Sequence, residues 1–283
     1  MRAALAQALG AEVVALEPVA GGSLNAAFRA TLAGGAAVFV KTSPDAAPGA
    51  YAAEAAGLRW LRAVDGGLPV PEVLGVDERW LALAWVDGGG RPDEAALGRG
   101  LAVVHRAGAA CAGELPGGGD RYVLGPLTLP NVPGGDWPHF YAESRLLPLT
   151  RMAADRGALD AAGVRAVEGV AGRIADLAGP AEPAARLHGD LWSGNVHAGA
   201  DGRPWLIDPA AYGGHREIDL AMLSLFGGPR TAAFAAAYDE VWPRADGHAD
   251  RVALYQLLPL LVHAVLFGGS YGGSARRAAE RYV

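Results

Sequence analysis

Cysteine is nearly absent from this chain: Cys111 is the only one among 283 residues. A single cysteine excludes an intrachain disulfide and fits a reducing compartment. Basic residues are also in deficit, because 24 Lys and Arg stand against 30 Asp and Glu, for a net charge of −6. Nucleic-acid binding depends on neutralising phosphates with Lys and Arg, and the sequence contains no basic cluster. We therefore expect no nucleic-acid partner.

The sequence has no apolar run of membrane-spanning length. Its most apolar stretch, Leu257 to Phe267, contains Pro259 and His263 and is too short to cross a bilayer. Near the N-terminus, Gln7 and Glu12 interrupt the alanine- and leucine-rich residues too early for a signal peptide. We therefore expect a cytoplasmic protein with no membrane partner. No pattern specifies the oligomeric state, and we expect a monomer.

Two common ligand-binding patterns are missing as well. The Walker A pattern G-x-x-x-x-G-K-[ST] does not occur, and the histidines lack the spacing of a zinc site such as H-E-x-x-H. What is present is the composition of a folded protein. Hydrophobic residues make up 51% of the chain, and 41 glycines with 19 prolines mark many turns. A chain of this length forms one large domain or two lobes.

The polar residues with the clearest chemical meaning lie between Arg186 and Asp208. The segment starting at Arg186 reads Arg-Leu-His-Gly-Asp-Leu-Trp-Ser-Gly-Asn, so that Asn195 follows Asp190 by five positions. Protein kinases have this spacing in the loop H-R-D-x-x-x-x-N, where the Asp accepts the proton of the attacking hydroxyl and the Asn binds a metal ion. Each residue alone fits an ordinary polar turn. As a set they predict that Asp190 is a catalytic base and that Asn195 and Asp208 bind Mg²⁺.

The predicted metal site depends on a hairpin between Asn195 and Asp208. The pair Asp201-Gly202 is a strong two-residue turn signal, and strand-like runs flank it. With that turn, Asn195 and Asp208 face each other across the strands, with Cβ atoms about 5 Å apart. One Mg²⁺ ion can bind both side chains at that separation. A longer loop would shift the register by about one residue without separating the pair.

A second group of candidate residues lies in the N-terminal part. Residues 37 to 41 read as a strand whose alternation places Lys41 on the face opposite Val40. A helix is predicted from Tyr51 to Val64, with Glu54 on its apolar face. In kinases a strand lysine contacts the nucleotide phosphates and is oriented by a glutamate from the next helix. We predict such a pair between Lys41 and Glu54; the alternative is a surface ion pair of little energetic consequence.

A glycine-rich turn precedes that strand and is a candidate phosphate-binding loop. It contains Gly21, Gly22, Ser23 and Asn25. Glycine lets backbone N–H groups approach phosphate oxygens closely, and the two polar side chains can add donors. In a chain this rich in glycine, a plain hairpin explains the same residues.

An interlobe hinge is predicted where the strand ending at Val86 meets the flexible residues 87–90. This hinge would separate an N-terminal nucleotide-binding lobe, residues 1–87, from a C-terminal catalytic and acceptor-binding lobe, residues 88–283. Backbone groups near Ala84 and Val86 are candidates for binding the adenine edge. A buried edge strand leading into a linker explains this stretch equally well.

The C-terminal part has mostly helical spacing from Pro92 onward. Residues 111–137 read as a long irregular loop, which in a compact domain is more often functional than idle. Further helices are predicted at about 138–156 and 160–178. Asp219 either caps a helix or accepts backbone N–H groups from the catalytic loop and fixes Asp190, and both alternatives stay open. We expect His188 to support that loop structurally.

These motifs together resemble those of the fructosamine kinases (ketosamine-3-kinases), relatives of the aminoglycoside phosphotransferases. The resemblance covers nearly the whole chain. Its most specific parts are H-G-D-L-W-x-G-N at 188–195 and D-P-A at 208–210, followed by G-H-R-E-x-D-L-A-M at 214–222. The segments 21–29, 39–41, 137–141 and 266–271, together with Glu54, also match.

The resemblance implies an α+β, bilobal protein-kinase-like fold. Its smaller lobe would be an antiparallel sheet with one main helix, and its larger lobe would be mostly helical. ATP would be held by Lys41 and the glycine-rich turn, with Mg²⁺ on Asn195 and Asp208. The family phosphorylates the 3-hydroxyl of ketosamines, which are sugars joined to amines by early glycation. The implied activity is therefore deglycation repair, acting on a small-molecule or protein-linked ketosamine. Ala84 departs from the acidic residue that many members have at the hinge.

Aromatic faces suit sugar rings and amine cations, so aromatic residues are candidates for the walls of the acceptor pocket. The candidates are Trp192, Trp137, Tyr141 and His215, each of which is equally compatible with the protein core. Two other functions stay open: an aminoglycoside or other small-molecule phosphotransferase, and a nucleotide-binding pseudokinase. The intact set of catalytic residues argues against the pseudokinase.

Overall fold

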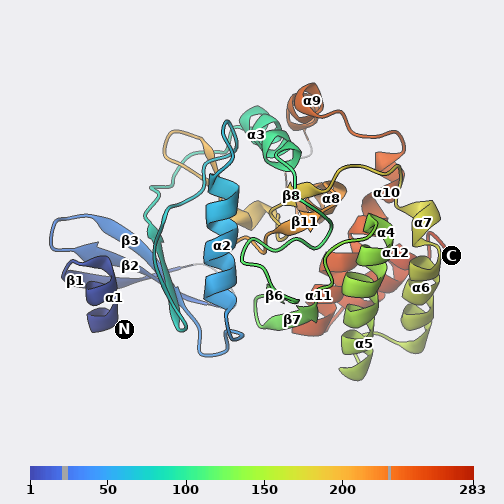
Figure 1. Cartoon of the computed structure of the whole chain (residues 1–283), viewed down its shortest axis with the longest axis horizontal. Coiled ribbons are helices and arrows are strands. Elements are labelled where there is room, and N and C mark those ends of the chain that lie inside the picture. The colour runs from blue at the N-terminus through green and yellow to red at the C-terminus, as the bar shows by residue number, and fades with distance from the viewer. Residues whose placement is uncertain (21–24, 229–230) are drawn as a thin grey trace.

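The computed structural model describes residues 1–20, 25–228 and 231–283, and Figure 1 shows the sheet-containing N-terminal part beside a larger helical part. The N-terminal part is built on a five-stranded sheet in the order β1-β2-β3-β5-β4, and every neighbouring pair is antiparallel. The elements of this part are α1 (Arg2–Leu9), β1 (Val13–Val19), β2 (Ala26–Leu32), β3 (Ala37–Thr42), α2 (Ala50–Arg62), β4 (Val73–Asp77) and β5 (Trp80–Ala84).

The two faces of this sheet are covered by different helices. On one face, Val38 and Val40 of β3 pack in a cluster with Leu5 of α1. On the other face, Leu58 of α2 packs with Leu81 of β5. Because side chains alternate along a strand, Lys41 lies on the α2 side. The alternation predicted for this strand is confirmed.

The larger part is mostly helical, as predicted. Its elements are α3 (Glu94–Arg106), β6 (Arg121–Leu124), β7 (Leu127–Pro130), α4 (Trp137–Tyr141), the π-helical turn η1 (Ala142–Leu146), α5 (Leu147–Asp155), α6 (Ala161–Gly172), α7 (Ile174–Leu177), β8 (Ala185–Leu187), the 3₁₀ turn η2 (Ser193–Asn195), β9 (Val196–Ala198), β10 (Pro204–Leu206), β11 (Tyr212–Gly214), α8 (Glu217–Leu225), α9 (Ala232–Val241), α10 (His248–Tyr255), α11 (Leu257–Phe267) and α12 (Tyr271–Ala279).

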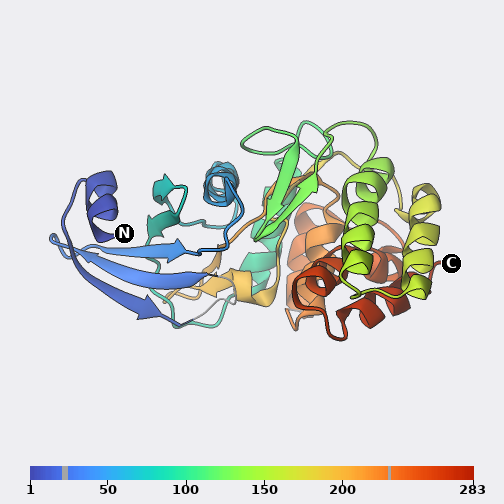
Figure 2. The same cartoon turned by 90° about the horizontal axis from the view of Figure 1, so that it is seen from below.

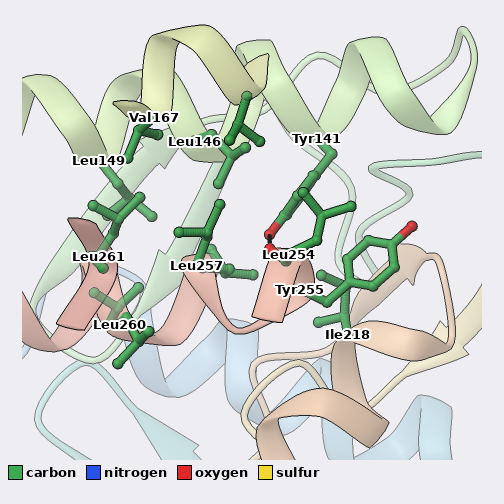
Figure 3. Packing of buried hydrophobic residues seen from close by; sticks show 14 of the residues in the cluster. Tyr141, Leu146, Leu149, Val167, Ile218, Leu254, Tyr255, Leu257, Leu260 and Leu261 are labelled. Carbon is green, nitrogen blue, oxygen red and sulfur yellow. Dashed lines mark hydrogen bonds between the residues drawn. The ribbon is translucent and has the colours of Figure 1, made fainter. Parts of the chain in front are cut away.

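Figure 3 shows the core of the larger part, in which aliphatic side chains of α11 pack against η1, α5 and α6. Leu257 and Leu261 of α11 are fully buried there with Leu149 and Val167. The stretch His248–Phe267 is long and apolar enough to cross a membrane by length and composition, but 67% of its apolar 18-residue segment is buried inside the protein. Burial on that scale is what a core helix of a globular protein shows.

Residues 111–137 are more ordered than the sequence suggested. They contain a β-hairpin, β6 and β7, whose turn holds Gly125 and Pro126. The prediction of an irregular loop was therefore wrong for residues 121–130. Both views place this hairpin between α2 and α4 (Figures 1 and 2). The hairpin thus stands where the two parts of the molecule meet.

The predicted hinge packs against the turn between β9 and β10. The Ala200 N–H donates to the Asp87 carbonyl at 2.8 Å, and Gly88 forms an isolated antiparallel bridge with Gly199. These contacts tie the segment leaving the sheet to the loop region of the helical part. The division into lobes 1–87 and 88–283 remains a prediction.

Candidate active site

The catalytic loop begins where β8 ends at Leu187. Gly189 has φ +81°, and a Cβ atom on it would lie 1.9 Å from the Ala210 carbonyl oxygen. Only glycine fits this position, because any side chain would collide with backbone. The close approach brings the segment after Asp208 against the segment that presents Asp190.

Asn195 contacts Asp190 directly. The Asn195 Nδ2 donates to the Asp190 carbonyl oxygen at 2.8 Å and to its carboxylate Oδ2 at 3.1 Å. Both donations use the amide nitrogen, so Asn195 Oδ1 remains as a possible metal ligand. The spacing predicted from the kinase loop therefore brings the two side chains together.

The register predicted for the β9–β10 hairpin was wrong by one residue. Trp205 pairs with His197 and Leu206 with Val196, so the loop spans residues 199–203. Asn195 consequently faces Ile207, whose N–H donates to the Asn195 carbonyl at 3.1 Å. The shift arises because Asp201 and Gly202 lie inside a longer loop. Asp208 nevertheless stays close, since Asn195 Nδ2 reaches its carbonyl oxygen at 3.5 Å.

Asp208 has an unusual backbone conformation. It is the only non-glycine residue with positive φ, +52°, among those the structure describes. Asp tolerates this region better than most residues, but the conformation is uncommon and concentrates at functional sites. It lets the chain turn into Pro209 directly after the strand-like run while the Asp208 side chain borders the cavity.

Lys41 contacts both Glu54 of α2 and Asp208, which follows β10. Its Nζ lies 2.6 Å from Glu54 Oε2 and 3.0 Å from Asp208 Oδ1. The residue is only 4% exposed. Burial alone would lower the Lys41 pKa, but the two carboxylates outweigh burial and raise it, so the amine stays charged. Burial raises the pKa of Glu54, and the nearby Lys41 opposes that shift.

The Asp190 carboxyl is perturbed as well. Burial, followed by the negative charge of Asp208, raises its pKa to about 7. The carboxylates of Glu54, Asp190 and Asp208 thus line one cavity, in which Lys41 is paired with Glu54 and Asp208. Such a site favours binding of a further cation and places a general base near neutral pH.

Asp219 holds the catalytic loop in place through hydrogen bonds to its backbone. Its carboxylate accepts the backbone N–H groups of His188 at 2.7 Å and Gly189 at 2.9 Å. It also accepts from His105 Nε2 at 3.1 Å, and His105 Nδ1 lies 2.8 Å from the Tyr238 hydroxyl. Of the two alternatives predicted for Asp219, helix cap or contact with the catalytic loop, the structure shows the contact with the loop. His105 is a hydrogen-bonded core histidine.

His188 holds the loop against the next segment. Its Nε2 donates to the Ile207 carbonyl at 2.9 Å, which leaves Nδ1 to accept from the Asp190 N–H at 3.3 Å. Burial lowers the His188 pKa, so the ring is neutral and this tautomer satisfies both contacts. The residue thereby links Asp190 to the end of β10.

Replacing Asp219 with Asn is expected to lower the free energy of unfolding by about 3 kcal/mol at pH 7, because a buried acceptor of three hydrogen bonds loses its charge. Burial alone would raise the Asp219 pKa, but the hydrogen bond from His105 and the other donors lower it. A lowered folded-state pKa stabilises the protein above the unfolded value, so the deficit should shrink as the pH falls below about 4. Urea unfolding as a function of pH measures this loss in the free energy of unfolding.

Asp239→Asn is the matched control for that variant, because Asp239 forms a partly exposed pair with Arg244. We expect it to cost less than about 1 kcal/mol. An equal loss in the two variants would contradict the role given to Asp219.

The reacting groups open into a cavity of about 980 Å³. One wall is the start of α2, a second is the β6–β7 hairpin with the loop before it, and a third is formed by α11 and the start of α12. The floor is the catalytic loop. Asn25, Lys41, Glu54, Asp190, Trp192, Asn195 and Asp208 all line this space.

The comparisons with known proteins agree with this geometry. The protein-family model described as fructosamine kinase matches residues 1–283. The chain belongs to the fructosamine kinase family. This confirms the resemblance noted in the sequence, and membership of a kinase family makes ATP the phosphoryl donor.

Several relatives of this chain support the assignment. A probable ketoamine kinase of Thermus thermophilus is 38% identical over 265 residues, covering 92% of this chain and 91% of the relative. The chloroplastic protein-ribulosamine 3-kinase of Arabidopsis thaliana is 31% identical over 289 residues, covering 99% and 86%. A crystal structure of a candidate fructosamine-3-kinase from Thermobifida fusca has a TM-score of 0.89 at 45% identity, covering 99% and 97%.

A more distant structure shows the fold alone. The macrolide 2′-phosphotransferase of Brachybacterium faecium has a TM-score of 0.61 at 16% identity, covering 98% of this chain and 95% of that one. The α+β, protein-kinase-like fold predicted from the sequence is therefore confirmed.

Three of the four residues predicted as acceptor-pocket walls lie elsewhere in the structure. Trp137 stacks on Tyr141 with ring centroids 5.2 Å apart, and His215 stacks on Tyr255 at 5.2 Å. Tyr141 and His215 are buried, and burial lowers the His215 pKa to about 4. None of the three lines the cavity, so the prediction is corrected: they pack the core. Trp192 does line it and is 39% exposed.

The predicted nucleotide contacts have mixed outcomes. Gly21, Gly22 and Ser23 lie outside the described residues. Asn25 borders the cavity, where its Oδ1 accepts from the Tyr51 hydroxyl at 3.2 Å.

The two predicted hinge contacts do not border the cavity. The Ala84 N–H already donates to the Glu72 carbonyl at 2.8 Å, so it is not free for adenine. Val86 lies beyond the end of β5, and neither residue lines the cavity. A role for either in adenine binding remains a prediction.

Sequence reasoning missed the residues that form the third wall of the cavity. These are Phe226, Val262, His263, Leu266, Phe267 and Tyr271. Phe226 lies directly after α8, and the others come from α11 and α12, whose apolar spacing predicts only core packing. Two signals were available: His263 interrupts an otherwise apolar run, and segment 266–271 matches the family without a role being assigned to it.

Proposed function

We propose that this chain transfers the γ-phosphoryl group of ATP to the 3-hydroxyl of a ketosamine. The observation that supports this most strongly is the convergence of Lys41, Asp190 and Asp208 on one cavity in a member of the fructosamine kinase family. Relatives named as ketoamine kinases and protein-ribulosamine 3-kinases indicate the substrate class. Both small-molecule and protein-linked ketosamines fit the proposal. We also propose a cytoplasmic, monomeric protein.

The donor set fits one or two Mg²⁺ ions bound with ATP. The described residues contain no group of three or more His, Cys, Asp or Glu side chains placed to hold a metal by themselves. Magnesium in kinases is held by one or two side chains together with substrate phosphates, so a small set is sufficient. Asn195 and Asp208 would supply the ligands. The ion would neutralise charge on the transferring phosphoryl group.

The remaining chemistry belongs to the protein side chains. Asp190 accepts the proton of the sugar 3-hydroxyl while that oxygen forms its bond to the γ-phosphorus and the bond to the β–γ bridging oxygen breaks, releasing ADP. Lys41, oriented by Glu54, binds the phosphates of ATP. The transition state is loose, so positioning and charge neutralisation supply most of the acceleration. Trp192, exposed beside the base, offers a flat face to the sugar.

Replacing Asp208 with Asn should raise the Mg²⁺ concentration needed for half-maximal rate by at least about tenfold, because the site loses its charged ligand. Titrating Mg²⁺ at saturating ATP measures the shift. Asp45→Asn is the matched control: Asp45 borders the same cavity outside the predicted metal pair, and its titration should not move. An unchanged titration in Asp208→Asn would contradict the metal assignment.

A substrate panel tests the proposed function. ADP release would be followed with ketosamines of fructose, ribulose and erythrulose, and with aminoglycosides, choline and homoserine. We expect turnover of the ketosamines alone. Turnover confined to another class would replace the proposal with a different phosphotransferase, and ATP binding without any product would revive the pseudokinase alternative.

A further inference from the structure

A connected series of aromatic rings follows the third wall of the cavity and reaches Trp192 in the catalytic loop. Trp192 contacts Phe226 with centroids 6.3 Å apart, and Phe226 contacts His263 at 4.8 Å. His263 in turn contacts Phe267 at 5.4 Å and Tyr271 at 5.0 Å. All five rings line the cavity. We call these five residues the aromatic strip.

The aromatic strip carries no charge at neutral pH. His263 Nδ1 lies 2.7 Å from the Pro259 carbonyl oxygen and therefore donates to it. Burial lowers the His263 pKa, so the ring is neutral. The charged side chains that line the cavity come from its other walls and its floor instead: Lys41, Asp45, Glu54, Asp120, Arg121, Asp190 and Asp208. The cavity is therefore divided into a charged side for phosphoryl transfer and an apolar aromatic side.

One end of the aromatic strip is at the reaction centre and the other is open. Trp192 follows the base Asp190 by two positions. At the far end, Phe267 is 46% exposed. A group lying along the strip would start beside the acceptor sugar and could continue out of the cavity.

The chemistry of a ketosamine matches this division. With its 3-hydroxyl at Asp190 and the phosphoryl donor on the Lys41 side, the rest of the molecule must extend away from Lys41. Its amine substituent is attached at C1, two carbons from the reacting C3. Two sides of the cavity remain for that substituent: the β6–β7 hairpin wall, which includes the charged residues Asp120 and Arg121, and the uncharged aromatic strip. The strip is the side on which an apolar substituent meets no charged group.

Resting on the proposed function, we propose that the aromatic strip binds the amine substituent of the ketosamine and selects substituents that contain an aromatic ring. Stacked and edge-to-face ring pairs are favourable beyond the area that they bury. An uncharged strip also accepts an apolar ring without burying an unpaired charge. The selection acts on binding and leaves the reacting groups unchanged.

The test compares two ketosamines with the same fructose moiety, one made from 2-phenylethylamine and one from methylamine. For the unmodified protein we expect a KM about tenfold lower for the phenylethyl compound, with similar kcat. His263→Ala and Phe226→Leu should bring the KM ratio close to one. His263→Phe keeps a ring and should keep most of the ratio. Trp205→Leu, outside the cavity, controls for general effects of losing an aromatic residue.

The outcomes separate this inference from the proposed function. Equal KM values for two good substrates, or a ratio that survives in His263→Ala and Phe226→Leu, would overturn the role of the aromatic strip alone. Absence of turnover with both compounds would overturn the proposed function and the inference with it. A changed ratio accompanied by unchanged kcat supports the inference, because a merely destabilised protein would lose active enzyme with both substrates equally.

Discussion

Asp190→Asn is expected to lower kcat by about two to four orders of magnitude while leaving ATP binding intact. The substitution keeps the size of the side chain and an oxygen that can accept from Asn195 Nδ2, which lies 3.1 Å from Asp190 Oδ2. What it removes is the ability to take the proton of the sugar hydroxyl. Steady-state kinetics with saturating ketosamine and ATP measures the loss, and ATP affinity measured separately should stay within about twofold.

The same variant should be more stable than the unmodified protein at neutral pH. Burial and Asp208 raise the Asp190 pKa to about 7, so the ionised carboxylate is disfavoured in the folded state. A raised acid pKa costs stability above that pH, and the cost disappears below the unfolded value near 4. We expect Asp190→Asn to gain about 1–2 kcal/mol at pH 8 and nothing at pH 4. A variant that is inactive and also less stable at pH 8 would show that Asp190 is structural.

Lys41→Met is expected to lower kcat/KM for ATP by about two to three orders of magnitude, because a preorganised charge that binds the phosphates is lost. It should also lower the free energy of unfolding by about 3 kcal/mol at pH 8, since Glu54 loses the partner 2.6 Å away. Because burial raises the Glu54 pKa, lowering the pH lets Glu54 take up a proton in the folded state. The stability deficit should therefore narrow toward pH 5.

The double variant Lys41→Met/Glu54→Gln separates the two effects. Removing the buried charge of Glu54 should restore most of the lost stability, whereas the rate with ATP should remain low. Chemical unfolding and kinetics on the same preparations measure both quantities. Recovery of activity together with stability would contradict a direct phosphate role for Lys41, and failure to recover stability would contradict the electrostatic account of the pair.

The catalytic side of the site was predictable because its chemistry depends on local spacing. Asp190 and Asn195 are close in sequence, and one tight loop brings them together. The Lys41–Glu54 pair followed from strand alternation and the apolar face of one helix. Asp208 was placed correctly beside them although the predicted hairpin register was wrong. The longer loop, residues 199–203, shifts the register by only one position and leaves Asp208 close to Asn195.

The acceptor side could not be predicted in the same way. Phe226 lies directly after α8, whereas His263 and Tyr271 come from α11 and α12, and their apolar surroundings in the sequence indicate only a buried face. Whether such a face meets the core or a cavity depends on how the helices pack. The same limit explains the errors at Trp137 and His215, whose ring contacts are formed with Tyr255 in the core.

The most direct test of the account is the position of the phosphate in the product. The protein would be incubated with ATP, Mg²⁺ and a fructose-derived ketosamine, and the product examined by ¹H–³¹P correlation NMR. We predict a single phosphorylated product whose phosphorus couples to the proton on C3. A phosphorus coupled to any other sugar proton, or the absence of a phosphorylated ketosamine while ATP binds, would contradict the geometry assigned to Asp190 and its cavity.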